Sequence, residues 1–493
     1  MSISTFYRNR PFSYNLSRLY CQTIYYPKRY NTSWQIWKNT EIQTPTYPYR
    51  AGNVSYNFSS EDLPQKCQTV NAMLLLTEKT PPRQVQMLVR DFIEDSIYNP
   101  FYGYYNKHSC ILSIPTSFEF SKIKDNNSFQ KELGKIYENY DKMAVQKGAK
   151  LPIQLWHTPT ELFKPYYGEA IARYILTHYK LSYYPYDDLI IYEVGSGNGT
   201  LMLNVMDYID RMDPDVYART KYYAIEISHP LATQQIEMLK NTKHYCEHQE
   251  KVEIINKSIF DWNTLNSNPC FFILLEVLDN FPHDLIRYNP ITQQAYQALA
   301  VIDEIGDIHE FYSPILDPLI IRYLSLKKKI TQTYKSKYND ISYLIKRLKT
   351  YLPFSENLID PEFIPTKQLL LFDILRNYFP EHKLIISDFF SLPDTIQGLN
   401  APIVQTRFSG MTIPCSTYLV KQGYFDIMFP TNFEVLKNVY KATCLQPGEN
   451  RHIEIYTHRR FLEQWADIET TKTISGENPM LDWFENVKIL ITQ

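Results

Sequence analysis

The chain has 493 residues, more than one ordinary domain needs, so we expect a core domain together with an accessory region or large insertions. Its 51 basic and 53 acidic side chains nearly cancel, which argues against general nucleic-acid binding, and no apolar run reaches the roughly 20 residues of a membrane span. The seven cysteines include no C-x-x-C pair, so we expect neither a disulfide framework nor a metal site.

The first 40 residues contain basic but no acidic side chains, with Ser, Asn and Tyr between them. An acidic-poor N-terminus of this kind is typical of a mitochondrial transit peptide. We therefore predict a transit peptide over residues 1–40 and a location in the mitochondrial matrix. A basic tail without a targeting role is the alternative.

Residues 41–150 are expected to form an N-terminal region that is irregular at first and helical later. Apolar residues at helical spacing predict a helix over 84–97, and a turn follows it. The polar, Lys- and Asn-rich stretch at 121–150 predicts an insertion with a weak helix. A stronger helical pattern over 170–179 leads into the next region.

Residues 151–310 alternate short apolar runs with helical segments, which is typical of a parallel, doubly wound α/β sheet buried on both faces. The expected strands are 189–194, 221–226, 252–255 and 271–276, and the expected helices are 200–209 and 231–240. Residues 311–366 are interpreted as a helical insertion. Residues 367–493 are expected to complete the sheet and to add a C-terminal accessory region.

The first of these strands ends in Glu193 and runs into Gly195, Gly197 and Gly199, after which a helix begins. Glycines allow positive φ and let a ligand lie against bare backbone. Dinucleotide turns are spaced G-x-G-x-x-G, whereas this turn reads G-x-G-x-G, which favours S-adenosyl-L-methionine as the cofactor. The Glu193 carboxylate suits a positively charged ligand and disfavours phosphates. A tight turn without a ligand is the alternative.

Three further residues are candidates for contact with the adenosine of such a cofactor. Glu226 ends the second strand, where a carboxylate can accept hydrogen bonds from both ribose hydroxyls, a role that would serve NAD equally well. Ser258 and Asp261 follow the third strand, in a loop that lies along the adenine in folds of this kind. Asp261 as a helix cap is the alternative.

The fourth strand delivers Glu276, Asp279 and His283 to the edge of the sheet where ligands bind. Methyl transfer is an in-line displacement that mainly requires a well-positioned nucleophile. If the nucleophile is a guanidinium nitrogen, Glu276 and Asp279 could orient the planar cation, and His283 could accept its proton. Asp279 as a turn cap and His283 as an ordinary side chain are the alternatives.

Several motifs occur in an order that resembles the MidA-like family of mitochondrial complex I assembly-factor methyltransferases. The segment 193–202 is similar to the family's E-x-G-x-G-x-G-T-L-M, and 275–282 to its N-E-x-x-D-A-L-P. Further similar elements are P-x-x-G-Y-Y at 100–105, T-S-P-E at 158–161, F-G-E at 167–169, V-E-x-S-P at 225–230 and a late D-x-T-x-x-V-D-F at 426–433.

The resemblance implies a class I methyltransferase fold with an added substrate region, and S-adenosyl-L-methionine as cofactor. It further implies symmetric, type II-like dimethylation of a protein arginine on a complex I subunit. The substrate-side motifs depart from the family: Leu275 stands for Asn, and Phe389-Phe390 for Tyr-Gly. A non-catalytic assembly protein with a vestigial cofactor site is the alternative.

Overall fold

The computed structural model describes residues 63–107, 109–114, 116–146, 154–241, 248–289, 292–333, 361–393, 400–408, 411–446 and 448–493. The predicted transit peptide lies outside these ranges, as does nearly half of the expected helical insertion, at 334–360. None of the helices within the described ranges is both long and apolar enough to cross a membrane.

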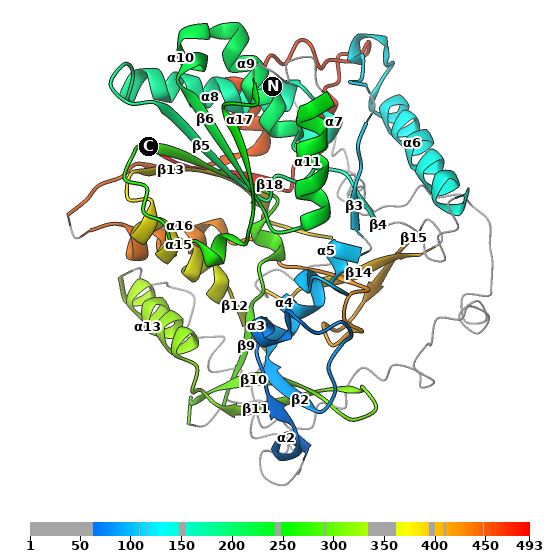
Figure 1. The fold of residues 1–493 in the computed structure, drawn as a ribbon, viewed down its shortest axis with the longest axis vertical. Coiled ribbons are helices and arrows are strands. Elements are labelled where there is room, and N and C mark those ends of the chain that lie inside the picture. Colours follow the sequence, from blue (N-terminus) through cyan, green and yellow to red (C-terminus); the bar gives the residue numbers. More distant parts are fainter. Residues whose placement is uncertain are drawn as a thin grey trace, which may run out of the picture.

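The central element of the fold is a sheet whose described strands follow the order β17-β18-β13-β8-β5-β6-β7 (Figure 1). β18 runs antiparallel to β13 and β17, and the other neighbours pair in parallel. From β5 the chain adds β6 and β7 on one side and then returns to add β8 on the other side. The point between β5 and β8 is therefore the topological switch point, where open α/β sheets bind ligands. The strands are β5 (Leu189–Val194), β6 (Thr220–Glu226), β7 (Val252–Asn256), β8 (Cys270–Leu275), β13 (His382–Phe389), β17 (Ile453–Thr457) and β18 (Val487–Thr492).

Helices cover both faces of this sheet. Leu189 and Ile191 of β5 pack into a core with α8 (Tyr166–Ser182) and α9 (Thr200–Met212), while the intervening Ile190 packs into a second core. That second core contains α15 (Thr366–Tyr378) and α16 (Phe433–Cys444). Because every residue of β5 is buried, the strand reads as an apolar run that only Glu193 interrupts. The predicted doubly wound α/β fold is confirmed.

A second sheet lies at the end of the molecule opposite α9 and α10 (Figure 1). Its order is β1-β2-β10-β9-β12, and β11 pairs with β10. It joins strands from the N-terminal region to strands that lie between β8 and β13 in the sequence. The strands are β1 (Gln68–Thr69), β2 (Val85–Leu88), β9 (Asp284–Tyr288), β10 (Ala295–Ile302), β11 (Ile308–Pro314) and β12 (Glu362–Ile364).

This accessory sheet differs from the organisation expected from the sequence. The predicted helix over 84–97 begins as β2 and becomes α4 (Val89–Tyr98) only at Val89. A strand followed directly by a helix blends the two hydrophobic periods, so the apolar positions of β2 read as part of the helix. Residues 284–302, which we expected in the core domain, build β9 and β10 of the accessory sheet.

The remaining elements connect the two sheets or extend them. β3 and β4 pair in parallel, and β14 pairs antiparallel with both β15 and β16. The polar stretch at 121–150 contains the expected helix, α6. These elements are α2 (Leu63–Lys66), α3 (Ala72–Leu75), α5 (Tyr104–Lys107), α6 (Asn126–Gln146), α7 (Pro159–Leu162), α10 (Pro214–Ala218), α11 (His229–Asn241), α13 (Pro318–Thr333), α17 (His458–Trp465), α18 (Pro479–Asp482), β3 (Ser109–Ile111), β4 (Gln154–Trp156), β14 (Ile403–Phe408), β15 (Met411–Cys415) and β16 (Asp426–Met428).

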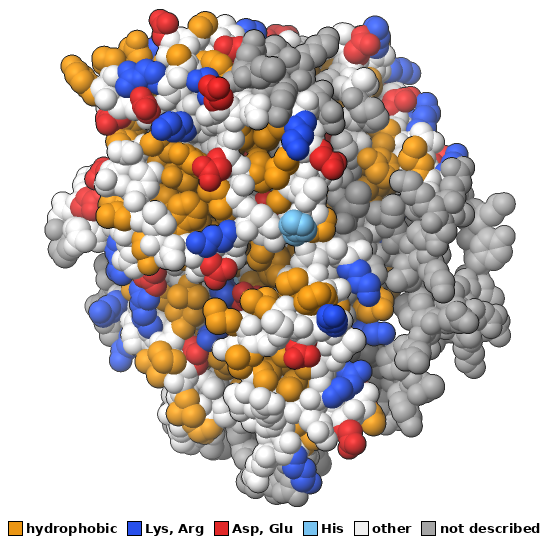
Figure 2. Space-filling view, in the orientation of Figure 1, with side chains coloured by type: hydrophobic (Ala, Val, Ile, Leu, Met, Phe, Trp, Pro, Cys, Tyr) orange, Lys and Arg blue, Asp and Glu red, His pale blue; other side chains and the backbone are white. Residues whose placement is uncertain are grey.

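The surface charges are mixed on the face shown in Figure 2. Lys and Arg side chains are interspersed with Asp and Glu side chains over the described residues of this face. The mixture agrees with the formal net charge of −2. This face of the described chain therefore lacks the basic stripe with which proteins bind a nucleic-acid backbone.

Candidate functional site

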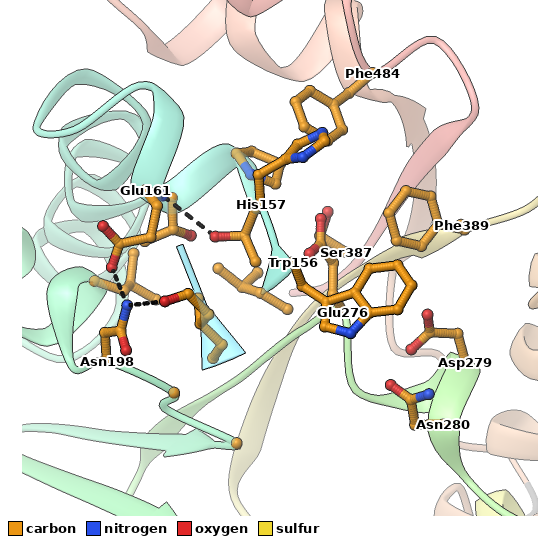
Figure 3. A pocket seen from close by; sticks show the side chains of 18 of the residues that line it. Trp156, His157, Glu161, Asn198, Glu276, Asp279, Asn280, Ser387, Phe389 and Phe484 are labelled. Atoms are coloured by element: carbon orange, nitrogen blue, oxygen red, sulfur yellow. Dashed lines mark hydrogen bonds between the residues drawn. The ribbon is translucent and has the colours of Figure 1, made fainter. Parts of the chain in front are cut away.

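A cavity of about 190 Å³ opens at the switch point of the central sheet (Figure 3). The turn after β5 and the loop after β8 form its floor, and side chains from β4, α7, β13 and β16 complete its walls. The predicted cofactor-binding residues and the predicted catalytic residues meet at this cavity. Five of them line it: Glu193, Gly195, Gly197, Glu276 and Asp279.

The glycine turn adopts the backbone that the G-x-G-x-G pattern requires. Gly195, Gly197 and Gly199 have φ values of 72°, 54° and 78°, in the left-handed region that side chains disfavour. A Cβ on Gly197 would lie 2.7 Å from the Cδ1 of Ile111, which is too close for two carbon atoms. Gly199 is the residue before α9 and lies outside the cavity lining. The turn therefore presents bare backbone to the cavity.

Glu226 holds this turn in place by a hydrogen bond to its backbone. Its carboxylate accepts hydrogen bonds from the backbone N–H groups of Gly197, at 3.1 Å, and Ser228, at 2.8 Å. Burial raises the pKa of Glu226 to about 7. Glu226 is not among the residues that line the cavity, so its contact with a ribose remains a prediction.

Glu193, the penultimate residue of β5, lines the cavity. Its carboxylate is buried and accepts a 2.8 Å hydrogen bond from the hydroxyl of Tyr222 on the neighbouring strand. Burial, together with the charge of nearby Glu226, raises the pKa of Glu193 to about 7. The glycine turn thus has two carboxyl groups beside it, Glu193 in the cavity lining and Glu226 outside it, that take up a proton more readily than exposed ones.

Glu161 is a site residue that our sequence reasoning missed. It lies in α7, where Thr158 accepts a hydrogen bond from its backbone N–H. Its carboxylate accepts hydrogen bonds from Asn198, at 2.9 Å, and Thr200, at 2.6 Å, and pairs with Lys164 at 3.0 Å. The segment 158–161 was noted only as an element similar to the family's T-S-P-E, and a Thr followed three residues later by Glu is also an ordinary helix cap, so neither feature assigned Glu161 to the site.

Glu276 and Asp279 form the opposite side of the cavity. Asp279 is buried and Glu276 is partly buried. In the described part of the chain, Oε1 of Glu276 and Oδ1 of Asp279 are shielded from solvent and have no hydrogen-bond partner. Burial and the charge of Asp279 raise the pKa of Glu276 well above its usual range, and burial raises that of Asp279 to about 7. Buried carboxylates are costly without a partner, so this pair is suited to a cationic ligand.

The backbone of Glu276 carries strain. Its φ is 54°, a left-handed conformation that is rare for a residue with a side chain. Such strain costs roughly 1–3 kcal/mol and persists mainly at functional sites. A glycine would relieve it, so the presence of a glutamate here supports a functional role for the carboxylate.

Asp426 of β16 adds a third carboxyl group to this side. It accepts hydrogen bonds from the Tyr105 hydroxyl, at 3.2 Å, and from Nδ2 of Asn280, at 3.1 Å. Burial and the charge of Asp279 raise the pKa of Asp426 to about 8. Asp426 belongs to a late motif with no sequence feature that connects it to the loop after β8, so its place in the site was not predicted.

Two aromatic rings flank the acidic side of the cavity. Figure 3 shows Trp156 and Phe389 on the side of Asp279, and both residues line the cavity. The indole N–H of Trp156 donates a 2.9 Å hydrogen bond to the Tyr104 hydroxyl, which holds the ring in place. Aromatic faces attract cations, so the rings and the carboxyl groups favour the same kind of ligand.

The structure does not bring His283 to the cavity. The chain turns after Asn280 into β9, and His283 is buried at this junction, where its ring stacks on Phe429 with centroids 3.9 Å apart. Its Nδ1 donates to the carbonyl of Phe281 at 2.8 Å, and burial lowers the pKa of His283 to about 3. These contacts favour a packing role over the predicted role as proton acceptor.

The loop after β7 also lies outside the cavity lining. The Ser258 hydroxyl accepts a hydrogen bond from the N–H of Phe260 and so caps the short turn Ile259–Asp261. Asp261 is exposed at the end of that turn. The residue that caps this turn is therefore Ser258 and not Asp261. Contact of either residue with an adenine stays a prediction.

The raised pKa values predict that the ligand-free protein loses stability as the pH rises. Glu193, Glu226, Asp279 and Asp426 have folded pKa values of about 7–8, above the value near 4 of an unfolded carboxyl. Between about pH 4 and pH 8 the folded state binds more protons than the unfolded state, so the free energy of unfolding falls. We expect the melting temperature to drop by roughly 3–6 °C between pH 5 and pH 8.

Differential scanning calorimetry at constant ionic strength measures this slope. The Asp279→Asn variant is the comparison, because it removes one of the four titrating groups and should flatten the dependence. Parallel slopes for the two proteins would show that Asp279 titrates normally.

Comparisons with known proteins show which sequences are similar to this chain. A protein family described as "Putative S-adenosyl-L-methionine-dependent methyltransferase" matches residues 170–448. The mitochondrial protein arginine methyltransferase NDUFAF7 homolog of Schizosaccharomyces pombe is 23% identical over 403 residues, 78% of this chain and 80% of that protein. Its Saccharomyces cerevisiae counterpart is 21% identical over 344 residues, 66% of this chain and 77% of that protein. Both relatives are mitochondrial, in agreement with the predicted location.

The fold is also shared with a solved structure. A Burkholderia thailandensis protein, crystallised with bound S-adenosyl-homocysteine, superposes with a TM-score of 0.52 at 13% sequence identity. The alignment covers 83% of this chain and 88% of that protein. The likeness therefore extends over the central sheet and well beyond it.

Proposed function

This chain belongs to the family of S-adenosyl-L-methionine-dependent methyltransferases, and we propose that it methylates an arginine side chain of a mitochondrial protein. The observation that carries the proposal is the pair Glu276 and Asp279, each with a carboxylate oxygen that is shielded from solvent and has no partner among the described residues. A guanidinium group offers a planar array of N–H donors and a delocalised positive charge, which match two neighbouring carboxylates.

The cofactor side of the cavity fits S-adenosyl-L-methionine. The bare backbone at Gly195 and Gly197 leaves room for the ligand, and we propose that it lies against this turn. Glu193 would attract the positively charged end of the cofactor, and Glu226 would accept hydrogen bonds from its ribose. When bound, the cofactor supplies a methyl carbon that is activated by a positively charged sulfur.

The other side of the cavity would hold and activate the acceptor. Glu276 and Asp279 would orient the guanidinium plane so that one nitrogen faces the methyl donor, and the rings of Trp156 and Phe389 would lie against its faces. The attacking nitrogen must lose a proton as it gains the methyl group. Asp279 suits this step, because burial raises its pKa to about 7, near the working pH of a general base.

We extend the proposal to the substrate that the family resemblance implies. The product would be symmetrically dimethylated arginine on a complex I subunit in the matrix, and the modification would support assembly of the complex. The names of the two fungal relatives, which are protein arginine methyltransferases, support the arginine acceptor.

Mass spectrometry of mitochondrial proteins from cells with and without this gene tests the proposal. We expect arginine methylation at one or a few sites to disappear without the gene and to return when purified protein and S-adenosyl-L-methionine are added to the extract. Unchanged arginine methylation would contradict the proposal. If calorimetry also showed no cofactor binding at millimolar concentration, a non-catalytic assembly role would replace it.

A further inference from the structure

We propose that Asp388 is a positioning residue that holds the loop carrying Glu276 and Asp279 in its active geometry. The inference rests on the proposed function, since it assigns the two carboxylates to the methyl acceptor. Asp388 lies at the end of β13, beside the end of β8, and is completely buried. It is not among the residues that line the cavity, so it would act through the loop.

Both oxygens of the Asp388 carboxylate accept hydrogen bonds from backbone N–H groups, two in this loop and one at the end of its own strand. One oxygen accepts hydrogen bonds from the N–H groups of Leu278, at 2.8 Å, and Asp279, at 3.2 Å. The other oxygen accepts from the N–H of Phe389 at 2.7 Å. Asp388 thus closes the short helical turn Leu278–Asn280 onto the edge of the central sheet.

The preceding residue of β13 fixes the other end of the loop. The carbonyl of Ser387 accepts a 2.8 Å hydrogen bond from the N–H of Glu276, one residue beyond the pairing of Ser387 with Leu275. The end of β13 therefore sets the position of both catalytic carboxylates, with Ser387 holding Glu276 and Asp388 holding Asp279. On the far side of the loop, the Asp279 carbonyl accepts from the N–H of Phe429 at 2.7 Å.

A carboxylate is an expensive choice for a purely structural anchor at this position. Asp388 is buried close to Asp279 and Glu276, and burial together with their charges raises its pKa well above the usual range. An amide could not replace it, because its NH2 group would face a backbone N–H donor on one side. Selection of a carboxylate against this electrostatic cost is understandable if the exact place of Asp279 matters for the reaction.

Asp388→Asn tests the inference. We expect the methyl-transfer rate per folded enzyme to fall about 10- to 100-fold, because a displacement near 1 Å of a catalytic group has an effect of this size. The dissociation constant for S-adenosyl-L-methionine should stay within about twofold of wild type, since the glycine turn is untouched. The acid limb of the pH–rate profile should also shift, because a displaced loop changes the distances from Asp279 to the titratable groups around it, which are Glu276, Asp426, Tyr98 and Tyr105.

The assay uses the full chain, tritiated S-adenosyl-L-methionine and protein extract from mitochondria that lack this protein. Glu310→Gln is the matched control, since Glu310 is another buried carboxylate that accepts hydrogen bonds from Tyr312 and Tyr418, but on β11 of the accessory sheet. It should lower thermal stability and leave the rate and the pH–rate profile unchanged.

Asp388→Ser provides a second variant in case the amide prevents folding. Its hydroxyl can accept one backbone N–H and leaves space for water, so we expect a folded protein with a rate between those of wild type and Asp388→Asn. Wild-type rates and profiles in either folded variant would overturn the inference while leaving the proposed function intact. An inactive wild-type protein would instead contradict the proposed function itself.

Discussion

Substitution of Glu276 by glutamine is expected to give a folded protein that binds S-adenosyl-L-methionine and transfers its methyl group about 10³-fold more slowly. The amide keeps the size of the side chain but removes the negative charge that would orient the guanidinium group. No described residue donates a hydrogen bond to Oε1 of Glu276, so the substitution breaks no known contact of that atom. Loss of a buried carboxylate should leave the stability equal or higher.

Glu276→Gly is expected to increase stability and abolish activity at the same time. The φ of 54° suits glycine, so this variant should gain roughly 1 kcal/mol in the free energy of unfolding while losing methyl transfer. Gln293→Gly is the matched control, because Gln293 has a φ of 59° and lies on the surface, away from the cavity. It should gain a similar stability and keep its activity.

Urea denaturation and single-turnover methylation measure the two quantities on the same protein. Activity of Glu276→Gln within tenfold of wild type would remove this carboxylate from the mechanism. The same variant also distinguishes an enzyme from an assembly protein in cells: a scaffold would still function without the carboxylate, whereas an enzyme would not.

Gly197→Asp is expected to weaken binding of S-adenosyl-L-methionine at least 100-fold, a loss of about 2.7 kcal/mol. The new residue must adopt a φ of 54°, its Cβ would meet Ile111 at 2.7 Å, and it would add a negative charge to the cavity lining. Calorimetry with the purified variant measures the dissociation constant, and circular dichroism shows whether the sheet is retained.

Gly476→Asp is the control for backbone strain alone. Gly476 has a φ of 85°, and a Cβ there would meet nothing within 4 Å. This variant should lose stability and bind the cofactor normally. Equal binding by Gly197→Asp and Gly476→Asp would show that the cofactor lies elsewhere.

The glycine turn after β5 was predictable because its signals are local. The strand, the glycines and the following helix are contiguous in the sequence, and Glu226 follows at the end of the next strand. The G-x-G-x-G spacing therefore specified both the turn and its position in the sheet. Glu276 and Asp279 were found in the same way, because they follow directly after β8.

The acceptor half was harder to predict because it is assembled from distant segments. Strands separated by up to 270 residues bring Asp388, Asp426 and Trp156 to the cavity region. No sequence motif around any of the three indicates which distant residues it will contact. His283 shows the opposite error. It is close to Asp279 in sequence, but the chain changes sheets between them, so proximity along the chain did not become proximity in the site.

The accessory sheet escaped prediction for a similar reason. β2 has only four residues, and its partner β10 begins at Ala295, more than 200 residues later. A strand of four residues is too short to show a clear hydrophobic alternation. The sequence of one segment also does not indicate which distant segment it pairs with. Homologous sequences would supply covariation between them, which a single sequence does not contain.

The pairing of β2 with β10 also determines the order in which the chain can fold. A chain that emerges N-terminus first, from a ribosome or through a translocation pore, presents residues 85–88 long before 299–302 are available to pair with them. The central sheet has the same property, since β18 at 487–492 is inserted between β13 and β17. Such high contact order delays folding and leaves strand edges open in the meantime. We therefore expect a vectorially delivered chain to depend on chaperones until its last strands are free.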